Sequence, residues 1–185
     1  MPYASVNNIE IYYETHGTGP PVIFAHGSGG NHLSWWQQVP YFSGSYTCVL
    51  YDHRSFGKTN DEIPPLGRGA FADDLRGLLD HLDFQKVAIV AHSMGGRSGS
   101  MFALRNPERV SALVLSGSNG GSDNEEARKV REIHKSKPPY HPAGVVRALS
   151  PQFVKKEKEK SFLYRQIMKS NPPHKSDFLE VPKHL

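Results

Sequence analysis

Apolar runs and helical repeats alternate along the first two thirds of the chain. Residues 21–25, 46–51, 86–91 and 110–115 form short runs that are apolar on both faces, which predicts buried strands. Between the second and third runs, apolar residues recur at helical spacing over residues 71–84, and a further helix is predicted from the turn at 92–96 to Arg105. This alternation predicts an α/β fold with a mostly parallel sheet that is covered by helices on both faces.

Two local elements are predicted before the second strand. Residues 3–15 alternate apolar and polar positions around Asn7-Asn8, which predicts a β-hairpin with an asparagine turn. Ser34 is a candidate N-cap for a helix through residues 35–39, which Pro40 is expected to end.

The pattern changes after Gly121. Residues 1–121 hold 8 Lys/Arg, 10 Asp/Glu and 16 of the 17 glycines, whereas residues 122–185 hold 14 Lys/Arg and 8 Asp/Glu. Helices are expected at 125–135 and 151–169, around a Pro/Gly-rich stretch at 138–144, and no further strand is found. We therefore predict two parts: a core at 1–121 and a helical lid segment at 122–185. Because Lys and Glu interleave at 155–160, a solvated helix face is favoured over a nucleic-acid site.

Composition narrows the class of protein. The chain has 185 residues, of which 37% are hydrophobic, and no apolar run approaches the roughly 18 residues of a membrane-spanning helix. Its first residues show no secretory signal. Cys48 is the only cysteine, which excludes an internal disulfide and a multi-cysteine metal site. We expect a cytoplasmic protein that binds neither membranes nor a metal; the sequence does not indicate its oligomeric state.

Two glycine-containing segments resemble phosphate-binding loops in sequence. Gly57-Lys58-Thr59 resembles the end of a P-loop, but Asp52 occupies the place of the first glycine, so that interpretation is rejected. Gly27-Ser28-Gly29 follows a strand as in a dinucleotide fingerprint, but the third glycine position holds His32. A loop that shapes some other site is favoured, and no cofactor is expected.

The most informative segment is Ala-His-Ser-Met-Gly-Gly at 91–96, between an apolar strand and a helix. It matches the nucleophile-elbow pattern G-x-S-x-G with alanine in the first glycine position. The tight turn needs small residues two positions before and after the serine, and Ala91 and Gly95 meet that need. Ser93 is therefore the candidate nucleophile. The alternative is an ordinary turn in which Ser93 caps the helix.

A serine nucleophile needs N–H donors for the oxyanion that forms when it attacks a carbonyl. Two backbone N–H groups are well placed by sequence: that of Met94, directly after the nucleophile, and that of Ser28, in the loop after the strand at 21–25.

Four segments of the chain resemble those of a known family in their order and spacing. These are the turn at 91–96, His-Gly-Ser-Gly-Gly at 26–30, Tyr-Asp-His-Arg-Ser-Phe-Gly-Lys-Thr at 51–59 and Asn-Pro-Glu-Arg-Val at 106–110. The family that they resemble is the α/β-hydrolase fold family. The chain looks most like 3-oxoadipate enol-lactonases, meta-cleavage C–C hydrolases and cofactor-free haloperoxidase-type esterases. The resemblance implies a serine hydrolase that cleaves a small ester, lactone or activated C–C bond through an acyl-enzyme. It also implies the site residues: Ser93 as nucleophile, Ser28 and Met94 as oxyanion donors, and His26, Gly27, Ala91, Gly95, Asp52 and Arg54 as residues that shape the loops.

The catalytic acid and base are not found in the sequence. The family places them on strands after the lid, so we expect the last strands, the acid and the base to lie beyond Leu185 and the chain to be truncated. Asp123 is a possible acid, but a solvated loop aspartate is favoured. The later histidines (134, 141, 174 and 184) lie in the charged tail, and His92 points away from its neighbour Ser93. Without a base, these 185 residues alone are expected to be inactive; the alternative is a non-catalytic ligand-binding or interaction protein on the same fold.

Overall fold

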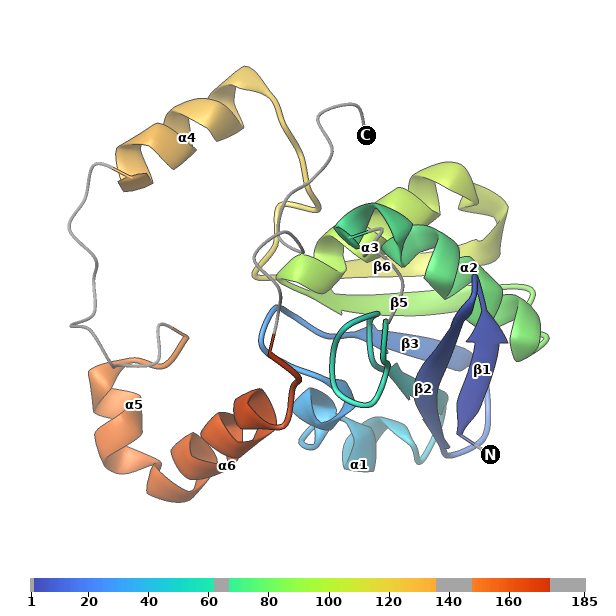
Figure 1. Cartoon of the computed structure of the whole chain (residues 1–185), viewed down its shortest axis with the longest axis horizontal. Coiled ribbons are helices and arrows are strands. Elements are labelled where there is room, and N and C mark those ends of the chain that lie inside the picture. Colours follow the sequence, from blue (N-terminus) through green and yellow to red (C-terminus); the bar gives the residue numbers. More distant parts are fainter. Residues whose placement is uncertain (1, 62–66, 136–147, 174–185) are drawn as a thin grey trace. The chain divides into compact units, whose positions relative to one another are not determined.

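A computed structural model describes residues 2–61, 67–135 and 148–173 of the chain (Figure 1). The chain divides into two compact units. The first comprises Met1–Gly121 together with Ile167–Leu185, and the second comprises Ser122–Gln166. The predicted role of residues 122–185 as a lid stays a prediction. The stretch 138–144 and the later histidines 141, 174 and 184 lie outside the described residues.

The first unit is built on a mixed, mostly parallel sheet, as the sequence predicts. The order of the described strands is β1-β2-β4-β3-β5-β6. The strands β4, β3, β5 and β6 run parallel to one another, and β2 pairs with β4 in antiparallel fashion. The bounds are β1 (Tyr3–Val6), β2 (Ile9–His16), β3 (Pro21–Ala25), β4 (Thr47–Tyr51), β5 (Val87–His92) and β6 (Val110–Ser116).

Alternate residues of the central strands belong to two separate hydrophobic cores, one on each face of the sheet. Ile23, Val49 and Ile89 face α2 (Phe71–His81) and α3 (Met94–Arg105). Their neighbours in sequence, such as Phe24 and Leu50, face the 3₁₀ turn η1 (His32–Trp35) and α1 (Val39–Phe42). Because successive side chains of a strand point to opposite faces, an apolar run fills both cores. Figure 1 shows α2 and α3 on one face of the sheet and α1 on the other, which confirms the predicted layers.

The predicted hairpin is present and its asparagine turn has the expected backbone. β1 and β2 pair in antiparallel register, and Asn7 and Asn8 have φ angles of 48° and 62°. Two consecutive residues with positive φ are typical of the type I′ turn that matches the twist of the strands.

The helix predicted after Ser34 is wrong. Asn31 caps the short turn η1, with its side chain accepting from the Leu33 N–H and Ser34 reciprocating at the Asn31 N–H. Pro40 lies in the first turn of α1 and so begins a helix instead of ending one. The first turn of a helix leaves its N–H groups without intrahelical partners, so a proline costs no hydrogen bond there.

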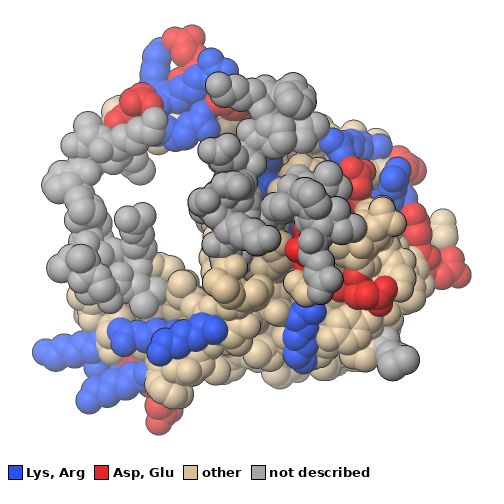
Figure 2. All heavy atoms as spheres, in the orientation of Figure 1, with Lys and Arg blue, Asp and Glu red and all other residues tan. Residues whose placement is uncertain are grey.

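The second unit contains α4 (Glu125–Lys135), as predicted, and α5 (Pro151–Lys156). The single helix predicted over 151–169 is interrupted, because α6 (Lys158–Lys169) begins after a break at Glu157, whose φ and ψ are −109° and 64°. The Glu157 N–H donates to the Phe153 carbonyl at the end of α5, and the Glu157 carbonyl accepts from the Ser161 N–H at the start of α6. Figure 2 shows many Lys and Arg side chains over α5 and α6, with an acidic residue among them, and Lys160 pairs with Glu157 at 3.0 Å.

Candidate active site

The chain turns sharply between β5 and α3, and Ser93 occupies the turn. Its φ and ψ are 49° and −112°, a conformation that side-chain-bearing residues rarely adopt. The Ser93 N–H donates to the Ser116 carbonyl at 3.0 Å, and its own carbonyl accepts from Gly96 at 3.0 Å. Ser93 occupies the N-cap position of α3, as the alternative interpretation has it, but its side chain makes no cap hydrogen bond. The residue is exposed to solvent.

Small residues on both sides of Ser93 allow the helix to approach the sheet. A β-carbon on Gly95 would collide with the Ala25 carbonyl oxygen and lie 2.7 Å from that of His26. Ala91 is fully buried and is paired with Ala25 in the parallel register of β3 and β5. The predicted steric need for a small residue is therefore present at Gly95.

The loop after β3 lies directly against the elbow. A β-carbon on Gly27 would lie 3.1 Å from the Ser93 β-carbon and 2.7 Å from the His92 Nδ1. Gly27 thus brings its neighbour Ser28 close to the serine. The backbone N–H groups of Ser28 and Met94 make no hydrogen bond to any described residue, so both are available to an external acceptor.

His26 ties this loop to the loop after β4. Its Nδ1 donates to the Gly27 carbonyl at 2.9 Å and its Nε2 accepts from the His53 N–H at 3.1 Å, a tautomer assigned from these partners. Complete burial lowers the pKa of His26 to about 4, so the ring is neutral. The resemblance assigns His26 a loop-shaping role, and this geometry supports it.

The acidic and basic groups after β4 are fully engaged within the core. Asp52 accepts from the His32 N–H at 2.6 Å and the Lys58 N–H at 2.8 Å. Arg54 donates to both oxygens of Asp74, at 2.6 and 2.7 Å. Because Asp52 is buried and has these partners, it does not offer its carboxylate to a nucleotide ribose, which argues against the dinucleotide interpretation.

Asn171, which sequence reasoning missed, joins two loops of the site. Its Nδ2 donates to the Gly29 carbonyl at 2.9 Å, and its Oδ1 accepts from the Gly57 N–H at 2.8 Å. Asn31 adds bonds to Ser170 at 2.9 Å and to the Ile167 carbonyl at 3.2 Å. These partners are separated by more than a hundred positions in sequence, so no local pattern could reveal them.

No catalytic base is found among the described side chains. None of the described histidines is hydrogen-bonded to Ser93; His92, its neighbour, is exposed. Asp123, the candidate acid, is exposed and forms ion pairs with Arg128, at 3.1 Å, and Arg131. Both arginines hold the pKa of its carboxyl below the usual range. These contacts pair Asp123 with arginines of its own unit.

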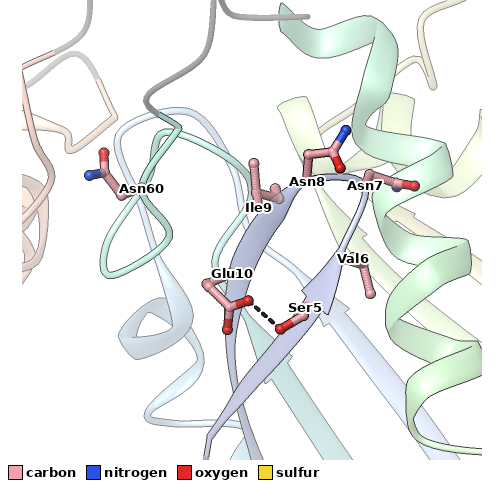
Figure 3. Close-up of a pocket in the computed structure, with 7 residues that line it drawn as sticks. All are labelled: Ser5, Val6, Asn7, Asn8, Ile9, Glu10 and Asn60. Carbon is pink, nitrogen blue, oxygen red and sulfur yellow. Dashed lines mark hydrogen bonds between the residues drawn. The ribbon is translucent and has the colours of Figure 1, made fainter.

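A hollow on the first unit lies away from Ser93, at the β1–β2 hairpin. A cavity of about 600 Å³ is lined by the β1–β2 hairpin and Asn60 (Figure 3). Glu10 is the one charged residue among those that line this cavity, and its carboxylate points toward Ser5 and accepts a hydrogen bond from the Ser5 hydroxyl.

Two general properties of the described residues bear on cofactors and membranes. No three His, Cys, Asp or Glu side chains within them are grouped so as to hold a metal ion. None of their helices has the length and apolar character needed to cross a membrane.

Known proteins share this fold and this order of segments. A family model described as the α/β hydrolase fold matches residues 20–183. The 2-hydroxy-6-oxononadienedioate/2-hydroxy-6-oxononatrienedioate hydrolase of Paraburkholderia xenovorans is 34% identical over 123 residues, which is 63% of this chain and 43% of that protein. The 3-oxoadipate enol-lactonase 2 of Acinetobacter baylyi is 26% identical over 160 residues, 84% of this chain and 60% of that protein.

Among solved structures, a thermophilic esterase from Thermogutta terrifontis is 25% identical with a TM-score of 0.74, over 92% of this chain and 67% of that one. The chain spans about half the length of the curated relatives it matches. The family identified from the sequence motifs is confirmed by the match of its model to residues 20–183. The chain belongs to the α/β hydrolase fold family.

Proposed function

We propose that Ser93 is the nucleophile of a hydrolase that cleaves a small ester, a lactone or an activated C–C bond. The observation that carries the proposal is the strained, exposed turn at Ser93, with the unpaired N–H groups of Ser28 and Met94 beside it. Such strain is concentrated at functional sites, where surrounding contacts maintain it.

The chemistry follows from these groups. The Ser93 hydroxyl attacks a carbonyl carbon, and the resulting oxyanion accepts hydrogen bonds from the two N–H groups. The leaving group departs to give an acyl-enzyme, which water hydrolyses. A base must take the hydroxyl proton, and we assign it to none of the described residues.

The curated relatives indicate the range of substrates. The two named above are a lactonase and a hydrolase, and their names denote carboxylate-bearing substrates. Action on small molecules, independence from nucleic acids and membranes, and a cytoplasmic location remain predictions from the sequence.

Ester turnover by the full-length protein tests the proposal. Ser93→Ala is expected to lower kcat on 4-nitrophenyl hexanoate by several orders of magnitude, because loss of a serine nucleophile removes the acyl-enzyme route. Ser111→Ala, which truncates an exposed serine on β6, is the matched control. Equal activity in wild type and Ser93→Ala would contradict the proposal. A folded protein with no turnover would favour the alternative of a non-catalytic binding protein.

A further inference from the structure

A small cavity is lined by three arginines and lies between the start of α2 and one side of α3, from the first turn of α3 to its last residue. Arg68, Arg97 and Arg105 contribute to its wall, together with Ser98 and Met101. Its volume is about 10 Å³, enough for one water-sized group such as a single oxygen atom.

Two of these arginines have no acidic partner among the described residues. Arg105 is paired with Asp73 at 3.3 Å. Arg68 and Arg97 form no hydrogen bond or ion pair with any described residue, and the Nε of Arg68 is shielded from solvent as well. Burial and the positive charge of Arg97 lower the pKa of Arg68. Two neighbouring cations, one with a buried unpaired N–H, favour binding of an anion that supplies the missing acceptor.

The pair lies at the same edge of the sheet as Ser93. Arg97 follows Ser93 by four residues, about 6 Å along the helix axis, and long helical side chains lean toward the N-terminal end. The Cγ of Arg97 lies 3.0 Å from where a β-carbon of Gly121 would be, and Gly121 follows the carboxyl end of β6. On the other side, Phe71, three residues after Arg68, packs against Met94.

We propose that Arg68 and Arg97 bind a carboxylate group of the substrate whose carbonyl reacts with Ser93. This assignment rests on the proposed hydrolase function and names its substrate class: esters or lactones with a second, negatively charged end. One carboxylate oxygen enters the cavity, where the guanidinium groups can donate charge-assisted hydrogen bonds to it. The rest of the substrate lies outside the cavity.

A pair of esters of equal chain length tests the subsite in the full-length protein. Mono-4-nitrophenyl adipate ends in a carboxylate, and 4-nitrophenyl hexanoate ends in a methyl group. Arg97→Met is expected to raise KM for the adipate ester by about 10- to 100-fold, because charge-assisted hydrogen bonds are lost, and to change KM for the hexanoate ester less than about 2-fold. Arg76→Met, an exposed arginine of α2 outside the cavity, is the matched control. Equal effects of Arg97→Met on both esters, or no effect on either, would overturn the subsite.

A binding measurement separates this proposal from the proposed function. In Ser93→Ala protein, calorimetric titration with adipate is expected to show binding that is weakened about 10-fold or more by Arg68→Met or Arg97→Met. Absence of adipate binding, or equal affinity in these variants, would overturn the subsite. If neither ester is turned over while adipate binds through the arginines, the subsite stands and the hydrolase function fails.

Discussion

Gly95 controls how closely α3 approaches β3. In an open helix, replacing glycine by alanine stabilises by about 1 kcal/mol. Here the added β-carbon would collide with the Ala25 carbonyl oxygen, so the elbow must shift. We expect Gly95→Ala to destabilise the fold by about 1–3 kcal/mol, measured by urea unfolding. Gly44→Ala is the control, because its nearest neighbour, the Tyr41 carbonyl, is 3.8 Å away. Stabilisation by Gly95→Ala would contradict this account of the turn.

Asn171 holds the loops after β3 and β4 together through one amide group. Asn171→Ala leaves the Gly57 N–H and the Gly29 carbonyl without that partner. We expect a loss of about 1–3 kcal/mol in the free energy of unfolding, measured with urea, and slower reaction of Ser93 with a fluorophosphonate. Gln37→Ala, at an exposed position, is the control. An unchanged rate of phosphonylation would show that this amide does not position the site.

At the residue scale, the candidate nucleophile could be predicted because its signal is local. Small residues at 91 and 95 around a serine, between an apolar strand and a helix, are visible in any single sequence. The roles of Asn171 and of the Arg68–Arg97 pair depend on contacts between distant segments. No spacing rule relates those segments, so the sequence could not reveal them.

At the scale of elements, two buried histidines join the loops that carry the site. Burial lowers the pKa of His26 to about 4 and that of His53 well below its usual value. Below pH 6.5 the unfolded chain binds protons that these folded rings exclude. The free energy of unfolding therefore has its full value, as far as these two rings are concerned, above pH 6.5. It decreases as the pH falls toward 4, by about 3 kcal/mol for His26.

Urea unfolding between pH 7 and pH 4 measures this dependence. We expect the free energy of unfolding to fall with pH in that window. In His26→Asn the amide can donate and accept hydrogen bonds but does not titrate between pH 7 and pH 4. We therefore expect this variant to take up about one proton fewer on unfolding than the wild type does, which makes its free energy of unfolding less dependent on pH. A slope that is the same in His26→Asn and in wild type would contradict the burial of a neutral His26.

Strand β6 is the edge of the described sheet. It pairs with β5, and no described strand pairs with its other side. Val114 and Leu115 are 52% and 40% exposed. An apolar strand edge is a template for association. We expect this 185-residue chain to self-associate in sedimentation experiments and Val114→Lys to reduce that association. Leu104→Lys, at a 77% exposed leucine of α3, is the control and should not. Equal effects of both substitutions would contradict association through the edge.

The elements themselves were predicted where apolar pattern decides them. The strands at 21–25 and 110–115 were predicted within one residue, because both runs are apolar throughout. β3 is buried as predicted, whereas the burial predicted for 110–115 is wrong in the described structure: the residues of β6 are half-buried or exposed, and no described strand covers its outer edge. The helix predicted at 35–39 failed because Asn31 caps earlier and Pro40 begins α1. The break at Glu157 lies in a charged run without apolar periodicity, so nothing in the pattern marks it.

At the scale of the whole molecule, the protein family is confirmed, and the hydrolase chemistry is our proposal. The core supplies a strained serine, two unpaired N–H groups and a pair of arginines at one edge of the sheet. We assign the base to none of the described residues, so hydrolase activity stays a proposal.

Covalent labelling of the full-length protein tests the central claim most directly. A fluorophosphonate reacts with a serine that a base activates and whose oxyanion site is formed. We predict one labelled peptide by mass spectrometry, modified at Ser93, and no labelling in Ser93→Ala. Ser111→Ala should be labelled as the wild type is. Absence of labelling in the folded wild-type protein, or labelling that persists in Ser93→Ala, would contradict the assignment of Ser93 as nucleophile.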